Sequence, residues 1–514
     1  MLAPAIMVQG TASSVGKSLF ATALCRYFKR EGLRVAPFKS QNMALNSAVT
    51  PDGREIGRAQ AVQADAAGAI ATADMNPILL KPEGDSRSQV VVLGKPIGSM
   101  NARDYQEYKP KLQQVIAESL ARLRASHDLV VIEGAGSPAE INLKARDIVN
   151  MHVAKIANAP VLLVGDIDRG GVFAAFVGTL ELLEPDERER IAAFVVNKFR
   201  GDVRLLEPGL DFLRARTGKP VLGVIPYVPR LRIADEDSVS LEDRVRRARP
   251  GRDQLDIAVV RLPRLANYDD VLALEHEPGV VVRFVEQPEQ ARDVDLLIVP
   301  GSKSTVSDLA WLRASGIAAV VAERVERAEP VLGICGGCQM LGESLADPEG
   351  VESSEPLVSG LGLLPLRTRF ERTKITAQVR ARVRARSFLS DPDSAEEVSG
   401  YEIHMGRVEL TAPQPPAFEL VLRNGEPTRV ADGAVSANGQ VVGTMLHGLF
   451  ENHALRAGLL HQLRARRGLQ APAAPLQPEL DRFSEYDRLE EVVRANVDRA
   501  LLARLAGGAV KLRS

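Results

Sequence analysis

Short runs of apolar residues, many of them β-branched, alternate with amphipathic helical stretches along the first half of the chain. Each run is apolar at nearly every position, which is typical of a strand buried on both faces of a parallel sheet. Gly, Asn, Asp or Pro stands at or near the end of each run, so polar and permissive residues gather at the carboxyl edge, where such sheets bind ligands. The predicted strands are residues 5–8, 129–132, 161–164, 193–196 and 221–225.

The alternation stops in a charged, irregular segment and then restarts. Residues 234–254 have no apolar face to bury, which indicates an interdomain linker. From about residue 449 helical periodicity dominates, and the proline-rich residues 471–478 interrupt it before a charged helix from about 481 to 505. A second parallel sheet is predicted from apolar runs at residues 255–260, 281–285, 295–299 and 331–334.

The length of the chain also favours two large domains. A chain of 514 residues exceeds what one hydrophobic core normally organises. We predict an α/β protein with two doubly wound domains, and the absence of a repeat at a period of about 20–50 residues argues against a solenoid. The predicted divisions are residues 1–233, a linker at 234–254, residues 255–455 and a helical extension at 456–514.

The charge balance and the cysteine content limit the binding partners and the cellular compartment that we expect. The 65 Lys and Arg residues nearly cancel the 66 Asp and Glu residues, so we expect neither nucleic acid nor an anionic membrane as a partner. Three cysteines form no paired framework, and a reducing cytoplasm suits a free catalytic thiolate. The first ten residues lack the pattern of an export signal, and no apolar run reaches the about 18 residues that cross a bilayer. We therefore expect a cytoplasmic protein, while the oligomeric state stays open.

A glycine-rich loop follows the first predicted strand and precedes a helix. Gly10, Thr11 and Gly16 allow the backbone to wrap a phosphate, Lys17 adds a mobile positive charge, and Ser18 offers a hydroxyl ligand for Mg²⁺. Five residues separate the two glycines, one more than in the usual P-loop, which indicates a lengthened variant. The sequence predicts ATP binding here, and the alternative is a chance glycine-rich turn.

Polar residues at other strand ends extend this predicted site. Glu133 follows an apolar strand and is expected to hold Mg²⁺ directly or through water, the alternative being a solvent-facing glutamate. Asn197 could read the nucleotide base, but Arg200 breaks the Asn-Lys-x-Asp pattern of GTPases, so guanine is not favoured. Further polar residues without an assigned role are Asp147, Asn150, Asp166, Asp168 and Lys198.

A second motif places a cysteine at a sharp strand-to-helix turn. In residues 333–342, GICGGCQMLG, small residues flank Cys335 as in a nucleophile elbow. The backbone N–H of Gly336 is a candidate oxyanion donor, and Gly301, which follows an earlier strand, is a second. A helix N-terminus behind the thiol favours a thiolate. Cys25 and Cys338 fall among apolar neighbours and are expected to be buried and inert.

A thiol that performs acyl transfer needs a base, and two of the seven histidines have suitable surroundings. We predict that His447 takes and returns the proton, because it follows an apolar strand of the same domain. His404 is the rival, although a structural or substrate-contacting role suits it better. Glutamine amidotransferases with a catalytic triad place a glutamate two residues after the histidine, where this chain has Leu449. The sequence thus favours a dyad and leaves open what orients the imidazole.

Together these motifs resemble the cobyric acid synthase family of dethiobiotin-synthetase-like amidotransferases over nearly the whole chain. The resemblance rests on QGTASSVGKS at residues 9–18, FKSQNMALNS at 38–47, GICGGCQMLG at 333–342, GYEIHMGR at 400–407 and the segment around His447. It implies a P-loop synthetase domain followed by a flavodoxin-like glutaminase domain. It also implies a corrinoid substrate, adenosylcobyrinic acid a,c-diamide, whose carboxylates b, d, e and g are amidated with ATP, Mg²⁺ and glutamine. The family lacks the third triad member as well.

This reading predicts that ATP phosphorylates a substrate carboxylate while Cys335 releases ammonia from glutamine. The nearest alternatives are a cobyrinic acid a,c-diamide synthase or another polycarboxylate amidoligase. From another class, the lengthened P-loop also resembles partitioning-type switch ATPases, against which the thiol elbow argues. A non-catalytic scaffold that kept both modules by descent is a third alternative.

Overall fold

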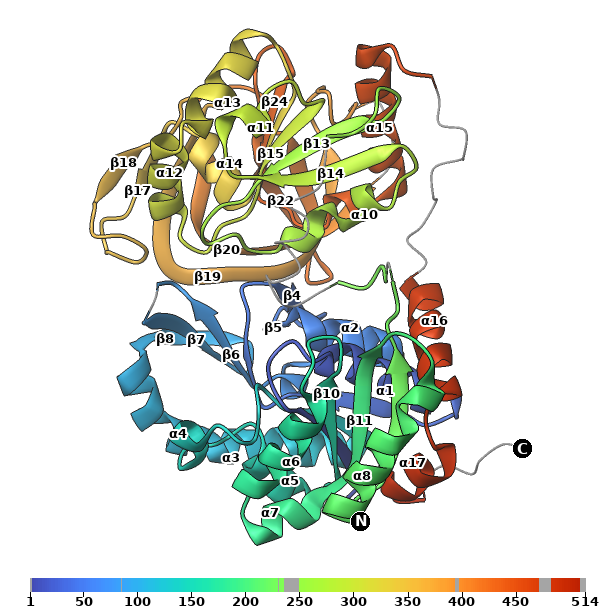
Figure 1. Cartoon of the computed structure of the whole chain (residues 1–514). Coiled ribbons are helices and arrows are strands. Elements are labelled where there is room, and N and C mark those ends of the chain that lie inside the picture. The colour runs from blue at the N-terminus through green and yellow to red at the C-terminus, as the bar shows by residue number, and fades with distance from the viewer. Residues whose placement is uncertain are drawn as a thin grey trace.

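The computed structural model of the chain describes residues 2–84, 86–229, 231–234, 249–392, 397–470 and 482–508. Two domains are stacked on one another, with the N-terminal domain at the bottom of Figure 1. Most of the predicted linker, residues 235–248, and the proline-rich residues 471–478 lie outside the described residues.

Six parallel strands form the central sheet of the N-terminal domain, in the order β12-β11-β10-β1-β9-β2. Met7 and Val130 belong to an apolar cluster on one face, and their neighbours Ile6 and Val131 belong to a cluster on the other. Both faces are therefore covered, as predicted for a doubly wound sheet. The strands are β1 (Ala5–Gly10), β2 (Val35–Phe38), β9 (Leu129–Glu133), β10 (Val161–Asp166), β11 (Ile191–Phe199) and β12 (Val221–Pro226).

Helices cover this sheet, and the first of them starts at the glycine-rich loop. Phe20, Leu24 and Phe28, four residues apart, are buried on one face of α1 against the sheet. Lys29 and Arg30 lie in its last turn, where positive charge complements the helix dipole. The helices are α1 (Lys17–Arg30), α2 (Arg58–Ala67), α3 (Ala102–Ser126), α4 (Ile141–Lys144), α5 (Met151–Ala157), α6 (Val172–Leu182), α7 (Pro185–Arg190) and α8 (Glu207–Thr217).

Two small sheets of the N-terminal domain face the second domain. One contains β3 (Gln41–Met43), β6 (Ile78–Pro82), β7 (Arg87–Val92) and β8 (Lys95–Asn101), and the other is the hairpin of β4 (Ser47–Val49) and β5 (Glu55–Gly57). Strand β4 contacts strands of the second domain, and Figure 1 shows it at the boundary between the domains. This hairpin leads directly into α2.

The second domain is built on another six-stranded sheet, in the order β14-β13-β15-β16-β24-β23. All its pairings are parallel except that of β23 with β24. The strands are β13 (Leu255–Val260), β14 (Val280–Val285), β15 (Leu296–Val299), β16 (Val331–Ile334), β23 (Ala434–Val435) and β24 (Val441–Thr444). The helices are α10 (Leu272–Glu275), α11 (Pro288–Ala291), α12 (Thr305–Ala314), α13 (Ile317–Glu326), α14 (Gly336–Leu341) and α15 (His453–Arg467).

A third, mainly antiparallel sheet has no counterpart in the sequence prediction. Its longest strand alternates buried and exposed residues at both ends, so its apolar side joins the core of the second domain while the other faces away. Its strands are β17 (Ser344–Ala346), β18 (Leu357–Ser359), β19 (Leu366–Val383), β20 (Glu397–Leu410), β21 (Phe418–Arg423) and β22 (Glu426–Asp432). In Figure 1, β19 and β20 run along the boundary with the first domain.

The C-terminal region divides between the two domains. Helix α15 packs into the core of the second domain through Leu459 and Leu460, whereas α16 (Arg482–Ala495) and α17 (Arg499–Leu505) pack on the first. A single helix from 481 to 505 is thus a wrong prediction. The helix breaks because Val497 pairs with Gly223 of the first sheet and Asp498 caps a new helix, accepting a hydrogen bond from the Leu501 N–H.

Among the described residues, no single helix is long and apolar enough to cross a membrane. Only α12 and α13 taken together reach that length and composition, and they are bent by 80° at their junction.

Candidate active sites

The glycine-rich loop lies at the carboxyl edge of the first sheet. The Thr11 N–H donates to the Val164 carbonyl at 2.9 Å, which ties the start of the loop to β10. Ser14 and Gly16 have φ values of 57° and 95°, and this left-handed backbone bends the loop toward α1. Lys17 Nζ donates to the carbonyl of Ala12 at 2.8 Å, so its ammonium lies inside the curve of the loop. The arrangement suits a phosphate-binding loop.

Glu133 forms a buried cluster of polar contacts beside this loop. Its carboxylate accepts hydrogen bonds from Ser18 Oγ at 2.7 Å, Lys39 Nζ at 2.9 Å and Gln63 Nε2 at 2.6 Å. Burial alone would raise the pKa of Glu133, but Lys39 and these hydrogen bonds hold it below its usual range. Glu133 does not face solvent as the alternative required. Its carboxylate and the Ser18 hydroxyl are hard oxygen donors that fit Mg²⁺.

The other polar residues at strand ends mostly support the loops. Asp147 accepts from the backbone N–H groups of Val149 and Asn150, and the Asn150 amide donates to the Ala135 carbonyl at 2.7 Å. Asn150 thus holds the turn that follows Glu133. The sequence had left the role of Asn150 unassigned.

Two residues near the carboxyl end of β11, Asn197 and Lys198, bond to the glycine-rich loop. Asn197 Nδ2 donates to the Val15 carbonyl at 2.8 Å, and Lys198 Nζ bridges the Ser14 carbonyl and Asp166, both at 2.8 Å. The contacts of Asn197 therefore go to the loop itself, and base recognition by this residue stays a prediction.

A cavity of about 1370 Å³ opens in front of the loop. Gly16, Lys17, Ser18 and Glu133 line it, whereas Gly10, Thr11 and Asn197 are not among its lining residues. Several cationic side chains also line it, and most of them are paired with carboxylates of the same wall. These cationic residues are Lys39, Lys109, Lys144, Lys155, Arg169, Lys198 and Arg200.

Cys335 occupies a strained turn between β16 and α14. Its φ of 52° and ψ of −111° place a residue with a side chain in a sparsely populated conformation. Small neighbours permit the turn, since a Cβ on Gly337 would meet the Val299 carbonyl oxygen at 1.9 Å and one on Gly333 would meet Leu341 at 2.6 Å. The geometry is that of a nucleophile elbow.

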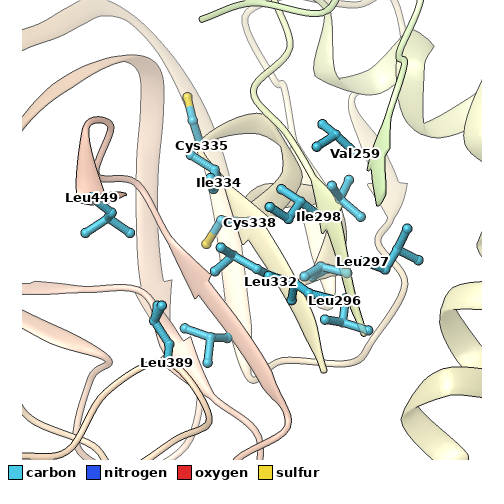
Figure 2. Packing of buried hydrophobic residues seen from close by; sticks show 14 of the residues in the cluster. Val259, Leu296, Leu297, Ile298, Leu332, Ile334, Cys335, Cys338, Leu389 and Leu449 are labelled. Atoms are coloured by element: carbon cyan, nitrogen blue, oxygen red, sulfur yellow. The ribbon is translucent and has the colours of Figure 1, made fainter. Parts of the chain in front are cut away.

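The three thiols differ in their surroundings. Figure 2 shows Cys338 within the apolar cluster near Leu332, while the Cys335 sulfur points away from that cluster. Burial raises the pKa of Cys338 and of Cys25 well above the ordinary value of a thiol. Both are buried, as expected from the sequence, and neither lines the cavity beside Cys335.

His447 lies next to Cys335, and Asp270 holds its ring. His447 Nδ1 is 2.7 Å from Oδ2 of Asp270, and the other oxygen of that carboxylate accepts from the Gly448 N–H at 2.9 Å. Burial alone would lower the pKa of His447, but Asp270 and the Cys335 thiol raise it to about 10. The imidazole is therefore held protonated on the nitrogen that faces Asp270, which leaves Nε2 for the chemistry.

The sequence favoured a dyad and left open what orients the imidazole, and the structure shows the Asp270 carboxylate against His447 Nδ1. It comes from the loop after β13 rather than from the position occupied by Leu449, which is buried in the core. The one local signal is the acidic pair Asp269 and Asp270 after an apolar strand. Nothing in the spacing connects that pair to His447, which is 177 residues away.

The rival His404 has structural contacts. Its Nδ1 lies 3.1 Å from the Gly406 carbonyl oxygen, and its Nε2 lies 3.5 Å from Glu402, which is itself paired with Arg423. His404 also lines the cavity beside Cys335, so a structural or substrate-contacting role for it stays a prediction.

The predicted oxyanion residues lie beside the thiol. A Cβ on Gly301 would stand 3.3 Å from the His447 ring and 3.8 Å from the Cys335 Cβ, so the Gly301 backbone adjoins both. Gly336 is the first residue of α14, directly after Cys335. A cavity of about 40 Å³ opens here, and Lys81 and Gln89 of the first domain contribute to its wall.

Comparisons with known proteins identify both domains. Residues 6–241 match the family model of a CobQ/CobB/MinD/ParA nucleotide binding domain, and residues 256–455 match that of a CobB/CobQ-like glutamine amidotransferase domain. The second match leaves a switch ATPase without support, since such a protein needs no amidotransferase domain.

Full-length relatives extend this similarity. The chain is 65% identical to the cobyric acid synthase of Sorangium cellulosum over 99% of both chains. It is 52% identical to that of Dehalococcoides mccartyi strain CBDB1 over 97% of both chains. It is 51% identical to that of Moorella thermoacetica, over 98% of this chain and 97% of the relative.

Proposed function

We propose a mechanism for this chain from the premise that it belongs to the cobyric acid synthase family. It is a glutamine-hydrolysing carbon–nitrogen ligase of cobalamin biosynthesis that uses ATP and acts on a corrinoid. We assign the carboxylates b, d, e and g of adenosylcobyrinic acid a,c-diamide as the groups amidated. The first domain activates them, and the second supplies the nitrogen.

In the second domain, Cys335 is the nucleophile that attacks the side-chain amide of glutamine. The backbone N–H groups of Gly336 and Gly301 face the oxygen that becomes negative, and His447 gives the leaving ammonia its proton. Water then hydrolyses the thioester and releases glutamate. Asp270 acts on His447, fixing the tautomer and stabilising the imidazolium. Support comes from the 2.7 Å contact between Asp270 and His447 and from the strained turn at Cys335.

In the first domain, a substrate carboxylate attacks the γ-phosphate of ATP, the bond between that phosphorus and the β–γ bridging oxygen breaks, and an acyl phosphate and ADP result. This step is needed because a free carboxylate repels an amine nucleophile and has a poor leaving group. Residues 10–18 hold the phosphates, with Lys17 as the mobile charge. Ser18 and Glu133 would hold Mg²⁺, which neutralises phosphate charge when bound. The Ser18 to Glu133 contact of 2.7 Å places both oxygen donors together.

One observation carries the coupling of the two halves: residues of both domains line the cavity beside Cys335. Lys81 and Gln89 come from the first domain, and Cys335 and His447 come from the second. Ammonia released there lies next to the first domain, and it then crosses that domain to attack the acyl phosphate, from which phosphate leaves.

The substrate assignment is tested by product mass. The enzyme is incubated with adenosylcobyrinic acid a,c-diamide, glutamine and ATP, and in parallel with cobyrinic acid. Each amidation exchanges OH for NH₂ and lowers the mass by about one unit. We expect stepwise conversion of the a,c-diamide. Turnover of cobyrinic acid alone, with the a,c-diamide untouched, would instead identify an a,c-diamide synthase.

A further inference from the structure

The first domain contacts the segment that holds His447. The Ser47 N–H donates to Asn267 Oδ1 at 2.9 Å, and the Tyr268 N–H donates to Asn46 Oδ1 at 3.3 Å. Asn267 Nδ2 in turn lies 3.5 Å from His447 Nε2. The loop before Asp270 is therefore fixed from two sides, by the hairpin of the first domain and by the histidine of the second.

Arg58, the first residue of α2, is the charged centre of this contact. Its Nη2 lies 2.7 Å from Asp269 Oδ2, 2.7 Å from the Tyr401 hydroxyl oxygen and 2.8 Å from the Ser47 carbonyl oxygen. The side chains of Arg58 and Asp269 are only 16% and 11% exposed. A charge pair this well covered from solvent is costly to break, because the remaining partner stays buried without compensation.

Both second-domain partners of Arg58, Asp269 and Tyr401, are next to a residue that contacts His447 or contact it themselves. Asp269 precedes Asp270, the residue on His447 Nδ1. The Tyr401 ring stacks on the His447 ring, with centroids 5.1 Å apart and planes inclined by 16°. The two backbones also exchange hydrogen bonds, from Tyr401 N–H to the His447 carbonyl at 3.1 Å and from His447 N–H to the Tyr401 carbonyl at 2.9 Å.

Arg58 offsets the negative charge of two adjacent carboxylates. Asp269 and Asp270 are adjacent carboxylates in a covered site, and Arg58 is the cation paired with the first of them. Burial raises the pKa of Asp269 above its ordinary value, Arg58 opposes this rise, and the neighbouring Asp270 adds to it. Without Arg58, Asp269 takes up a proton or turns toward solvent, and either way the ion pair that ties the segment of Asp270 to the first domain is gone.

We propose that Arg58 is a positioning residue of the glutaminase site that is contributed by the synthetase domain. Through Asp269 and Tyr401 it holds Asp270 and the stacked Tyr401 ring in place against His447. The proposal rests on the assignment of Cys335 and His447 as the glutaminase. It makes glutamine hydrolysis dependent on the contact between the domains, so that ammonia is released only where the first domain is in place to receive it.

The test compares three variants of the full chain: Arg58→Met, Arg58→Lys and the double variant Arg58→Met/Asp269→Asn. Glutaminase kcat and KM are measured together with amidation supported by free ammonia. We expect Arg58→Met to lower glutaminase kcat by about tenfold or more, with KM for glutamine nearly unchanged because Arg58 does not touch the substrate. Arg58→Lys keeps the charge and should retain an intermediate kcat. The double variant removes both charges and should recover part of the loss.

Thr376→Val is the matched control, since Thr376 Oγ1 of β19 donates to the Gly53 carbonyl of the same hairpin at 2.6 Å and Thr376 does not line the cavity beside Cys335. We expect its glutaminase kcat to stay at the level of the unaltered enzyme. Wild-type kcat in both Arg58→Met and Arg58→Lys overturns the proposal, as does an equal loss of ammonia-supported amidation in either. Neither result touches the proposed function, which fails only if Cys335→Ala still hydrolyses glutamine.

Discussion

Asp270 Oδ2 lies 2.7 Å from His447 Nδ1, joining residues 177 positions apart in the chain into one hydrogen-bonded pair. The carboxylate fixes the tautomer in which Nε2 faces the chemistry. We therefore expect Asp270→Asn to lower glutaminase kcat by about a hundredfold or more. The neutral amide carries no negative charge to stabilise the imidazolium, and it permits the wrong tautomer of the neutral ring. Steady-state glutaminase assays measure this. Ammonia-supported amidation is the control, and an unaltered kcat would return the site to a dyad.

The protonation state of His447 gives a second prediction. Its pKa is raised from the ordinary 6.5 to about 10, so the imidazolium stabilises the folded protein fully below pH 6.5, and this contribution is lost as the pH rises through about 10. Histidine-ring NMR of the unaltered enzyme should show one imidazole that titrates near the upper value. In Asp270→Asn this titration should move to lower pH. A His447 signal that titrates near 6.5 in the unaltered enzyme contradicts the account.

Thiol chemistry separates Cys335 from the other cysteines. Only Cys335 borders the cavity beside His447, whereas Cys25 and Cys338 are fully buried with raised pKa values. An electrophilic glutamine analogue should therefore label one thiol per folded chain, and glutamine should protect it. Peptide mass spectrometry identifies the labelled site. Labelling that persists in Cys335→Ala would be incompatible with this assignment.

The Glu133 cluster predicts separable losses of activity. Glu133→Gln removes the charge that would hold Mg²⁺ while keeping the size of the side chain. We expect amidation to fall by about a hundredfold even with free ammonia, because phosphate charge is no longer neutralised. Glutaminase kcat, measured on the same sample, should change far less. Full amidation by this variant would place the metal elsewhere.

Sequence patterns predicted the features that depend on local order. Every predicted strand coincides with a strand of one of the two central sheets to within one residue or lies inside it, and both motif residues, Lys17 and Cys335, stand at strand-to-helix turns. Such turns depend on small residues next to an apolar run, so a single short segment of the sequence is enough to predict them.

Contacts between distant segments were out of reach of the same reasoning. Asp270 and Arg58 have no motif of their own, and their roles arise only when the loop after β13 meets His447 and the start of α2. The break before α17 is similar, since it depends on Val497 pairing with Gly223. The alternation of buried and exposed residues in β19 was a local signal for the third sheet. It was missed because the prediction relied on continuous apolar runs, which β19 lacks.

The most direct test of the central claim, that sulfur chemistry in the second domain supplies nitrogen to a carboxylate activated in the first, is corrinoid amidation by Cys335→Ala. Its rate is measured with glutamine and, separately, with ammonium as the nitrogen source. The account predicts that amidation with glutamine is lost while amidation with ammonium stays close to that of the unaltered enzyme. Undiminished amidation with glutamine would contradict it.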